Sequence, residues 1–326
     1  VLGLLLYFEQ IEFDAFLSCY IGSWAVSAIL LTIQAFQLPQ RIGNTWRWDE
    51  FKNIFDFSLF SLFAAGAAII ATHLDYVMIG MYIGLAQVPI YTIGFFLGSV
   101  VGMPTRATQG ILGGLSATLV AQRKTTEINE MNRRSARVNF LLAAVIMSGI
   151  WAGIAPFQLL LPTGYRGLEF VFLCIGLQRL IVSFNVVNNQ VLAFSQWYRI
   201  VLPLNLGLVV VTVATNYLFI VTLGWGLKGA AVATLGTALW NNVWRLLIVW
   251  RKYKTHPFSW KLLVISIVAI ASAWSFHWQA DAFTYPIVGA IIQGALASGT
   301  TFSVCYALGC FPELRDGIKA RISWWP

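Results

Sequence analysis

The chain is dominated by apolar runs of about 20 residues that are separated by short polar segments. A helix needs roughly 20 apolar residues to cross the ~30 Å hydrocarbon core of a bilayer, so each run has the length of one crossing. The pattern predicts nine full transmembrane helices, over residues 15–36, 54–83, 88–120, 138–161, 168–194, 199–222, 227–250, 260–278 and 286–308. The run 88–120 is too long for one straight crossing and predicts a tilt or an interfacial turn.

Composition supports the same fold class. Of the 326 residues, 58% are hydrophobic and 10% are charged, whereas soluble domains carry about 25% charged residues. A further apolar stretch, Val1–Phe8, lacks the basic region and cleavage site of a signal peptide, so we expect a chain that begins partway through a helix. The sequence predicts an all-α integral membrane protein with about nine full transmembrane helices and one partial helix.

The basic residues follow the alternation of the spans. Sixteen Lys and Arg fall in one set of loops, and only Arg166 and Lys228 fall in the other. Because cytoplasmic loops carry the excess of Lys and Arg, this set and the C-terminus are predicted to be cytoplasmic. The rule also accounts for the net charge of +8 without nucleic acid as a partner. The sixteen are Arg41, Arg47, Lys52, Arg123, Lys124, Arg133, Arg134, Arg137, Arg199, Arg251, Lys252, Lys254, Lys261, Arg315, Lys319 and Arg321.

Signatures of enzymatic chemistry are missing from the sequence. The longest loops, Gln37–Asn53 and Gln122–Arg137, have about 17 residues, and no GxxxxGK[ST] motif occurs. No Ser-His-Asp arrangement, HExxH motif or Cys/His cluster is present, and the four cysteines match no metal or redox spacing. We therefore expect a protein that is not an enzyme, uses no cofactor or metal, and does not hydrolyse ATP itself.

Among the ionisable side chains inside predicted spans, the candidates for a polar pathway are His73, Asp75, Arg106 and Arg179. At 1.5 Å per residue, Arg179 lies roughly 16 Å below the outer end of its span, and Asp75 lies at a similar depth. Arg106 lies roughly 27 Å down, near the cytoplasmic side. Such residues face a cavity or a partner helix, so Asp75 and Arg179 either form a structural ion pair or share one polar cavity.

The run 168–194 is the most polar of the predicted spans. At 100° per residue, Gln178, Asn185, Asn189 and Gln196 fall within about 40° of one another. Arg179, Ser183 and Gln190 form a second stripe about 120° away. Amides that only join helices usually occur singly, so a face this broad favours the wall of a cavity that holds water or a polar ligand.

The run 88–120 carries a stripe of small and polar residues within about 80° of arc. Small residues allow close helix approach, and this interpretation stands beside that of a pathway wall. Pro104 is predicted to kink the helix because it removes a backbone hydrogen bond. The stripe comprises Tyr91, Gly98, Gly102, Thr105, Gln109, Gly113 and Ser116.

Several motifs together resemble those of a known family. His73-Leu-Asp-Tyr-Val-Met-Ile-Gly80, followed by Gln87-Val-Pro-Ile-Tyr91, resembles the "LDxxMIG…vGxY" pattern at helix seven of polysaccharide flippases, with Pro89 at the usual glycine. Gly229-Ala-Ala-Val-Ala-Thr234, Trp240-Asn241 and Arg251-Lys-Tyr-Lys-Thr-His-Pro-Phe258 resemble helix twelve and the loop after it. These flippases, of O-antigen or capsule type, belong to the multidrug/oligosaccharidyl-lipid/polysaccharide exporter superfamily.

The resemblance implies a fold of fourteen helices in two six-helix lobes plus two extra helices. On this template, residues 1–36 are the end of the first lobe and 37–53 are a cytoplasmic linker. Residues 54–250 are the complete second lobe, and 251–326 are the two C-terminal helices and a cytoplasmic tail. The chain would therefore be N-terminally truncated.

The resemblance also implies a function. Flippases of this family move undecaprenyl-pyrophosphate-linked oligosaccharides from the cytoplasmic to the periplasmic face of the bacterial inner membrane by alternating access. The implied partners are this lipid-linked oligosaccharide, membrane lipids, and the glycosyltransferases and polymerase of the same pathway. Cations suit the pyrophosphate and amides suit sugar hydroxyls, so the candidate substrate-binding residues are Arg179, Asn185, Asn189, Gln178, Gln190, Arg106, Gln109 and Asp75.

Two other functions remain open at this point. A cation-coupled multidrug exporter of the same fold would favour acidic residues in its cavity, and Asp75 is the only acidic residue well inside a predicted span. A membrane-embedded polysaccharide polymerase or acyltransferase would need a large periplasmic loop or a reactive side chain, and the predicted outer loops are short.

Overall fold

The computed structural model of the chain describes residues 13–37, 48–161, 165, 167–277 and 286–310. The chain divides into two compact units, Val1–Asp56 and Phe57–Pro326. All regular elements in the described residues are helical, as the pattern of apolar runs predicts. Arg41, Arg47, Arg166, Arg315, Lys319 and Arg321 lie outside these residues, as do Val1–Phe8 and most of the predicted linker 37–53.

The first unit contains one complete described helix, α2, over Phe13–Gln37. Its bounds agree with the predicted span 15–36, and its described side chains are almost all exposed, including Trp24 and Leu31. A helix that is apolar on all sides is suited to contact with lipid.

The helices of the second unit follow the predicted spans closely. Apolar length fixes these elements because a lipid-embedded backbone must satisfy its hydrogen bonds within each segment. Helix α3 runs over Trp48–Tyr82, beginning before the boundary between the units. The others are α4 (Val88–Val101), α5 (Met103–Ala121), α6 (Thr125–Gln158), α7 (Leu168–Phe184), α8 (Val186–Ala193), α9 (Val201–Asn216), α10 (Gly226–Tyr253), α11 (Trp260–His277) and α12 (Pro286–Ala307).

Two of the predicted spans are each broken into a bent pair of helices. Helices α4 and α5 meet at Gly102 with a bend of 51°, and Pro104 lies in the first turn of α5, where proline is tolerated. The predicted kink is therefore confirmed. Helices α7 and α8 meet at Asn185 with a bend of 57°. The estimate of one continuous polar face over 168–194 assumed a straight helix, and it fails beyond Asn185.

Helix α6 is longer than the span predicted over 138–161. It begins at Thr125, so at 1.5 Å per residue its 34 residues extend for roughly 50 Å, well beyond the thickness of the hydrocarbon core. The prediction of a loop over Gln122–Arg137 is therefore wrong for most of that segment. Hydropathy detects only the apolar part of a helix, and here the charged residues continue the same helix past the apolar part.

Short irregular elements adjoin α9 at both ends. A 3-10 turn, η2 (Tyr198–Ile200), precedes it, and a π-helical turn, η3 (Tyr217–Thr222), continues it. Gly224 and Gly226 then have positive φ angles of 65° and 56°, which allow the chain to reverse into α10. A further 3-10 turn, η1 (Leu85–Gln87), connects α3 to α4.

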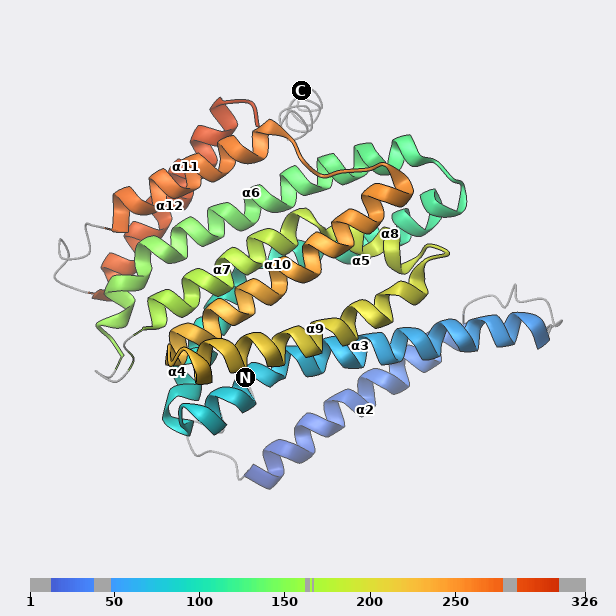
Figure 1. The fold of residues 1–326 in the computed structure, drawn as a ribbon, viewed down its shortest axis with the longest axis horizontal. Coiled ribbons are helices and arrows are strands. Elements are labelled where there is room, and N and C mark those ends of the chain that lie inside the picture. The colour runs from blue at the N-terminus through green and yellow to red at the C-terminus, as the bar shows by residue number, and fades with distance from the viewer. Residues whose placement is uncertain (1–12, 38–47, 162–164, 166, 278–285, 311–326) are drawn as a thin grey trace. The chain divides into compact units, whose positions relative to one another are not determined.

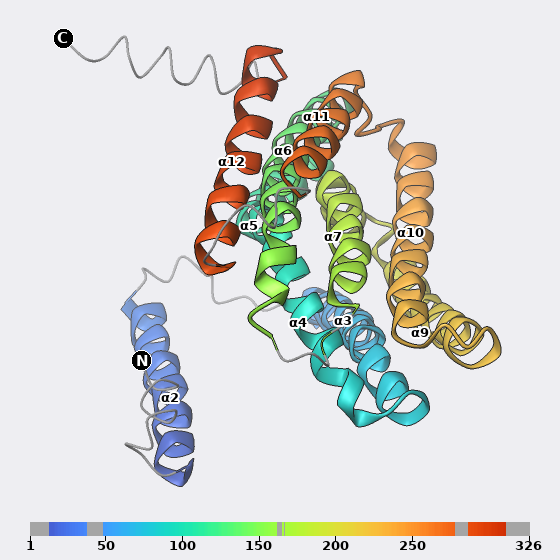
Figure 2. The same cartoon turned by 90° about the vertical axis from the view of Figure 1, so that its left-hand side faces the viewer.

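Helix α6 lies at the centre of the packing in the second unit. It contacts α7 and α5, and helices α11 and α12 lie along it, as Figure 1 shows. Helices α10 and α9 lie beyond α7 (Figure 2). The contact between α6 and α12 is close because a Cβ at Gly153 would lie 2.6 Å from the carbonyl oxygen of Ala290. Small residues that allow such an approach are typical of helix pairs in membranes.

The two bent pairs pack against each other along their whole length. Helix α4 contacts α7, and α5 contacts α8. Four glycines of the α4–α5 pair each face a residue of the α7–α8 pair, and the separation in sequence is the same in every case. The two pairs therefore run in parallel, and the same register continues across both breaks. The facing residues are Gly94 and Val171, Gly98 and Ile175, Gly102 and Arg179, and Gly113 and Gln190. Close helix approach is therefore one role of the small-residue stripe.

Within the described residues, six helices are long and apolar enough to cross a membrane, and eight spans result if each bent pair counts as one. Helix α10 covers the remaining predicted span but carries Asn241, Asn242 and Arg245. The chain is thus a multi-pass, all-helical membrane protein. The predicted division into linker, lobe and C-terminal helices stays a prediction.

Candidate functional site

A polar cavity of about 110 Å³ lies among α3, α4, α7, α9 and α10. It brings together Asp75, Gln178 and Arg179, three of the residues predicted from the sequence. Of the two arrangements left open for Asp75 and Arg179, the structure has the shared cavity, because no ion pair of 4 Å or less joins these two described residues. The cavity is also lined by Ala71, Thr72, Phe95, Val182, Leu208, Thr212, Thr234, Thr237, Ala238, Asn241 and Asn242.

Asp75 is hydrogen-bonded on both carboxylate oxygens. The Asn216 amide nitrogen donates to Oδ1 at 2.6 Å, and the hydroxyls of Tyr91 and Thr234 donate to Oδ2 at 3.0 and 2.9 Å. The four residues come from α3, α9, α4 and α10, and Asp75 is 3% exposed. Neutral donors therefore satisfy this carboxylate, and it joins four helices without the help of a cation.

Arg179 has the opposite surroundings. Its guanidinium carbon lies 5.1 Å from the centre of the Phe95 ring, a cation–π contact, and its Nε is buried without a hydrogen-bond partner. No hydrogen bond from its guanidinium to another described residue is found. Its aliphatic stem crosses the break in the neighbouring pair, because a Cβ at Gly102 would lie 3.3 Å from its Cδ. The neighbouring helix thus packs against the aliphatic part of the Arg179 side chain, and hydrogen-bond donors of the guanidinium group stay available for a ligand.

Gln178 adds an unused acceptor to the same cavity. Its Oε1 is buried and has no partner, so the cavity has an unsatisfied acceptor beside the unsatisfied donor of Arg179. Buried polar atoms are normally paired, and unpaired ones call for an explanation such as a ligand or water. A ligand with both acceptor and donor oxygens, such as a phosphate beside a sugar hydroxyl, would satisfy both.

The other predicted residues lie outside this cavity. Arg106 and Gln109 are exposed on α5, and Arg106 donates to the Ser99 carbonyl at 3.2 Å. Gln190 is partly buried against Gly113 on the α5–α8 side. His73 is exposed and contacts the ring of Tyr76. The predicted roles of Arg106, Gln109 and Gln190 in substrate binding stay predictions.

Asn185 belongs to a buried chain of four asparagines. The amide nitrogen of Asn132 donates to Asn188 at 2.8 Å, Asn188 donates to Asn185 at 2.8 Å, and Asn185 donates to Asn242 at 3.2 Å. These four asparagines join α6, α8 and α10 at the break between α7 and α8. The side-chain nitrogen and oxygen of Asn185 are both paired within this row, so in this conformation Asn185 acts as a structural link between helices.

Arg245 is a polar centre that the sequence pattern did not reveal. Its guanidinium donates to the side-chain oxygens of Asn241 at 3.0 Å, of Asn205, and more weakly of Asn189 at 3.5 Å. Asn205 in turn donates to the Ala64 carbonyl of α3 at 2.7 Å. One feature of the sequence could have indicated this centre: Asn241 and Arg245 are four residues apart and therefore lie on one face of a helix. The predicted site residue Asn189 thus contacts Arg245.

Metal-binding groups are not apparent in the described ranges, which contain no cluster of three or more His, Cys, Asp or Glu residues. Cys174, Cys305 and Cys310 are buried, and Cys19 is exposed. The polar groups that line the polar cavity are those of Arg179, Asp75 and Gln178, together with hydroxyl and amide groups.

Comparison with known proteins gives one family match. Residues 16–157 match a family described as polysaccharide biosynthesis protein. No curated protein matches the sequence. The match agrees with the resemblance to polysaccharide-synthesis flippases that the motifs indicate, and that resemblance is confirmed.

Two solved structures show a distant likeness at 16% identity. A MOP superfamily transporter from Pyrococcus furiosus has a TM-score of 0.46, with 78% of this chain and 67% of that chain covered. A MATE protein in complex with Br-NRF has a TM-score of 0.41, with 75% and 64% covered. The chain thus spans about two thirds of each structure, and at these scores the likeness adds nothing to the functional argument.

Proposed function

We propose that this chain, which is similar over residues 16–157 to polysaccharide biosynthesis proteins, belongs to a flippase for lipid-linked oligosaccharides in a bacterial inner membrane. It would carry an undecaprenyl-pyrophosphate-linked oligosaccharide from the cytoplasmic to the periplasmic face by alternating access. The basic loops, such as that around Arg251 and Lys252, would lie on the cytoplasmic side.

One observation carries the proposal: Arg179 faces a polar cavity with donors that no other described residue uses. A charged side chain inside a membrane protein is costly, so it is expected to have a partner at some stage of the working cycle. An arginine can hold two phosphate oxygens with parallel hydrogen bonds, and the pyrophosphate of the substrate supplies such oxygens.

The size of the cavity restricts what it could hold. A volume of about 110 Å³ suits one phosphate group and not an oligosaccharide. In our proposal, Arg179 binds one phosphate of the pyrophosphate, and the side-chain oxygen of Gln178 accepts a hydrogen bond from a hydroxyl of the first sugar. The remaining sugars would occupy space outside this cavity.

The state of Asp75 favours the flippase over a cation-coupled exporter. A cation site in the cavity would need carboxylate oxygens that are open to the ion. Both oxygens of Asp75 already accept hydrogen bonds from Asn216, Tyr91 and Thr234. The cavity therefore offers an unsatisfied cation and a satisfied acid, which suits an anionic ligand.

The test is a flipping assay on the full-length protein in proteoliposomes, with a fluorescent undecaprenyl-pyrophosphate oligosaccharide as the probe. Protection of the probe from a membrane-impermeant quencher reports its transfer. We expect Arg179→Lys to lower the rate at least tenfold while the unfolding temperature stays unchanged, because an ammonium cannot reproduce the two parallel hydrogen bonds. Arg251→Lys, at an exposed arginine at the end of α10, is the matched control.

A second pair of variants separates substrate binding from a structural role. If Arg179 and Asp75 needed each other for folding, then Arg179→Ala would lower the unfolding temperature. Combining it with Asp75→Asn would then restore both stability and flipping. We expect no such rescue, and its appearance would end the proposal.

A further inference from the structure

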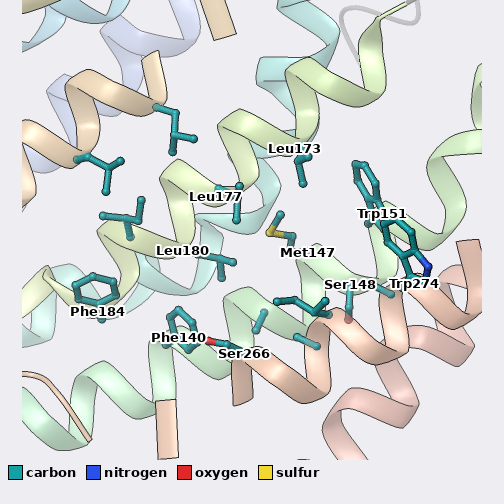
Figure 3. A pocket seen from close by; sticks show the side chains of 17 residues that line it. Phe140, Met147, Ser148, Trp151, Leu173, Leu177, Leu180, Phe184, Ser266 and Trp274 are labelled. Atoms are coloured by element: carbon teal, nitrogen blue, oxygen red, sulfur yellow. The ribbon is translucent and has the colours of Figure 1, made fainter. Parts of the chain in front are cut away.

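A larger cavity of about 540 Å³ lies among α6, α7, α10 and α11. It uses other faces of the two helices that also line the polar cavity. Leu177 and Leu180 of α7 line the large cavity, whereas Gln178 and Arg179 line the polar one. The large cavity, here called the apolar groove, is shown in Figure 3. The transport proposal does not use it.

The walls of the apolar groove offer almost nothing to a polar ligand. Its two hydroxyl groups are occupied, because Ser148 donates to the Val145 carbonyl and Ser266 donates to the Leu262 carbonyl, each at 2.9 Å. The rest of the lining is aliphatic or aromatic. A polar group placed there would lose its hydrogen bonds, so the chemistry of the groove selects a hydrocarbon.

The two ends of the apolar groove differ. At one end, Phe140 lies against Phe184 and Phe184 lies against Phe258, with ring centres 6.3 and 5.9 Å apart. This end of the groove lies toward the predicted cytoplasmic side. At the other end are the indoles of Trp151 and Trp274, as Figure 3 shows. Tryptophan is enriched where hydrocarbon meets the lipid headgroups.

The length of the apolar groove fits one half of a bilayer. Phe140 and Trp151 mark its ends on α6, and at 1.5 Å per residue they are roughly 16 Å apart along the helix axis. Half of the hydrocarbon core is about 15 Å, which is the depth that one acyl chain spans. A polyprenyl chain is several times longer and could not be contained in it.

The apolar groove is open to the outside of the helix bundle. Its rim includes Ile270 at 67% and Leu239 at 44% exposure, from α11 and α10. In a membrane-spanning bundle, such side chains face lipid. A hydrocarbon chain could therefore enter sideways from the bilayer without passing a polar group.

We propose that the apolar groove is a binding site for one acyl chain of a membrane phospholipid. The chain would enter beside Trp151 and Trp274 and end against Phe140 and Phe184. The headgroup would lie beyond the indoles, near His277, which stacks on Trp151 with ring centres 5.1 Å apart. Affinity would come from filling a shaped void, because transfer from lipid to protein brings no hydrophobic gain.

The test compares two phenylalanine substitutions on α11. Ala269 lines the apolar groove, so Ala269→Phe places a ring in its interior. Ala271 is exposed on the same helix and does not line it, so Ala271→Phe is the matched control. The full chain and both variants are purified in detergent, and retained lipid is measured by native mass spectrometry. Unfolding temperatures are then recorded with and without added dioleoyl phosphatidylethanolamine.

We expect the unchanged chain and Ala271→Phe to retain one phospholipid each and Ala269→Phe to retain at least tenfold less. Added lipid should raise the unfolding temperature of the first two proteins only. If Ala269→Phe does not fold, Leu239→Trp fills the apolar groove from its exposed rim and should give the same loss. Equal retention in a folded groove variant, no lipid on the unchanged chain, or a polyprenyl phosphate in place of a phospholipid would each overturn the proposal.

Discussion

Arg179 and Arg245 both lie inside predicted membrane spans, and they differ in what the chain provides around each guanidinium. Three asparagines from α8, α9 and α10 accept hydrogen bonds from Arg245. Arg179 has one aromatic ring below it and a buried Nε without a partner. The comparison separates an arginine that holds helices together from one that is left available for a ligand.

The same contrast applies to the amides near the two arginines. Asn205 links Arg245 to the backbone of α3, so its amide group is used on both sides. Gln178, next to Arg179, has a buried oxygen that accepts no hydrogen bond from a described residue. A buried network that is fully satisfied stabilises a fold, whereas a partly satisfied one costs stability unless a ligand completes it. The unsatisfied groups of Arg179 and Gln178 therefore agree with their proposed role in binding a ligand.

The largest effect on the free energy of unfolding is expected when each arginine is replaced in turn and the two variants are compared. Arg245→Leu leaves the oxygens of Asn205 and Asn241 without their donor and should lower the free energy of unfolding by about 3 kcal/mol. Arg179→Leu removes an unsatisfied charge and should change that free energy by less than about 1 kcal/mol. Denaturant or thermal unfolding in detergent measures both. Equal losses in the two variants would remove the distinction on which the functional argument depends.

The sequence predicts the positions of the helices better than it predicts the bends within them. Helix positions such as 260–278 and 286–308 were predicted within one or two residues of α11 and α12, because apolar length is set by the bilayer. The bend at Gly102 was also signalled, by Pro104. The bend at Asn185 had no such signal. The hydrogen-bond partner of Asn185 on another helix is Asn242 of α10, and its position depends on the tertiary fold.

The candidate site was predicted only in part for a similar reason. Depth within a span identified Asp75 and Arg179, and the structure places both at one cavity. Depth alone could not tell that Asp75 is satisfied by Tyr91, Thr234 and Asn216, because Thr234 and Asn216 come from segments 159 and 141 residues away. Arg245 lies close to the basic loop at Arg251, so it resembles an arginine at a helix end that reaches toward water.

A smaller effect is expected from the glycines that set the register of the bent pairs. In Gly98→Ala, the new Cβ would lie 2.9 Å from the Cβ of Ile175, so α4 and α7 must separate. We expect a loss of about 1–3 kcal/mol in the free energy of unfolding, as for other overpacked contacts. Since α7 carries Arg179, flipping should fall as well.

Gly114→Ala is the control for this substitution. Gly114 lies on α5, and nothing lies within 4 Å of an added Cβ. Alanine is the better helix former by about 0.5–1 kcal/mol, so this variant should be neutral or slightly more stable. The same unfolding measurement compares the two. A Gly98→Ala variant as stable as Gly114→Ala would show that α4 and α7 do not need their close contact.

The smallest expected effect is at Arg106, which completes the comparison as an exposed arginine. Arg106 makes one hydrogen bond, to the Ser99 carbonyl at 3.2 Å, and water can replace that bond. Arg106→Gln should therefore change the free energy of unfolding by no more than about 0.5 kcal/mol. Its positive charge acts on Arg179 through space, so its removal should alter flipping modestly, by less than about fivefold, and the change should shrink at high salt. Flipping rates at low and high ionic strength measure this effect. A loss above tenfold that persists at high salt would mean that Arg106 contacts the substrate directly, as the sequence predicts, and would extend the binding site beyond the polar cavity.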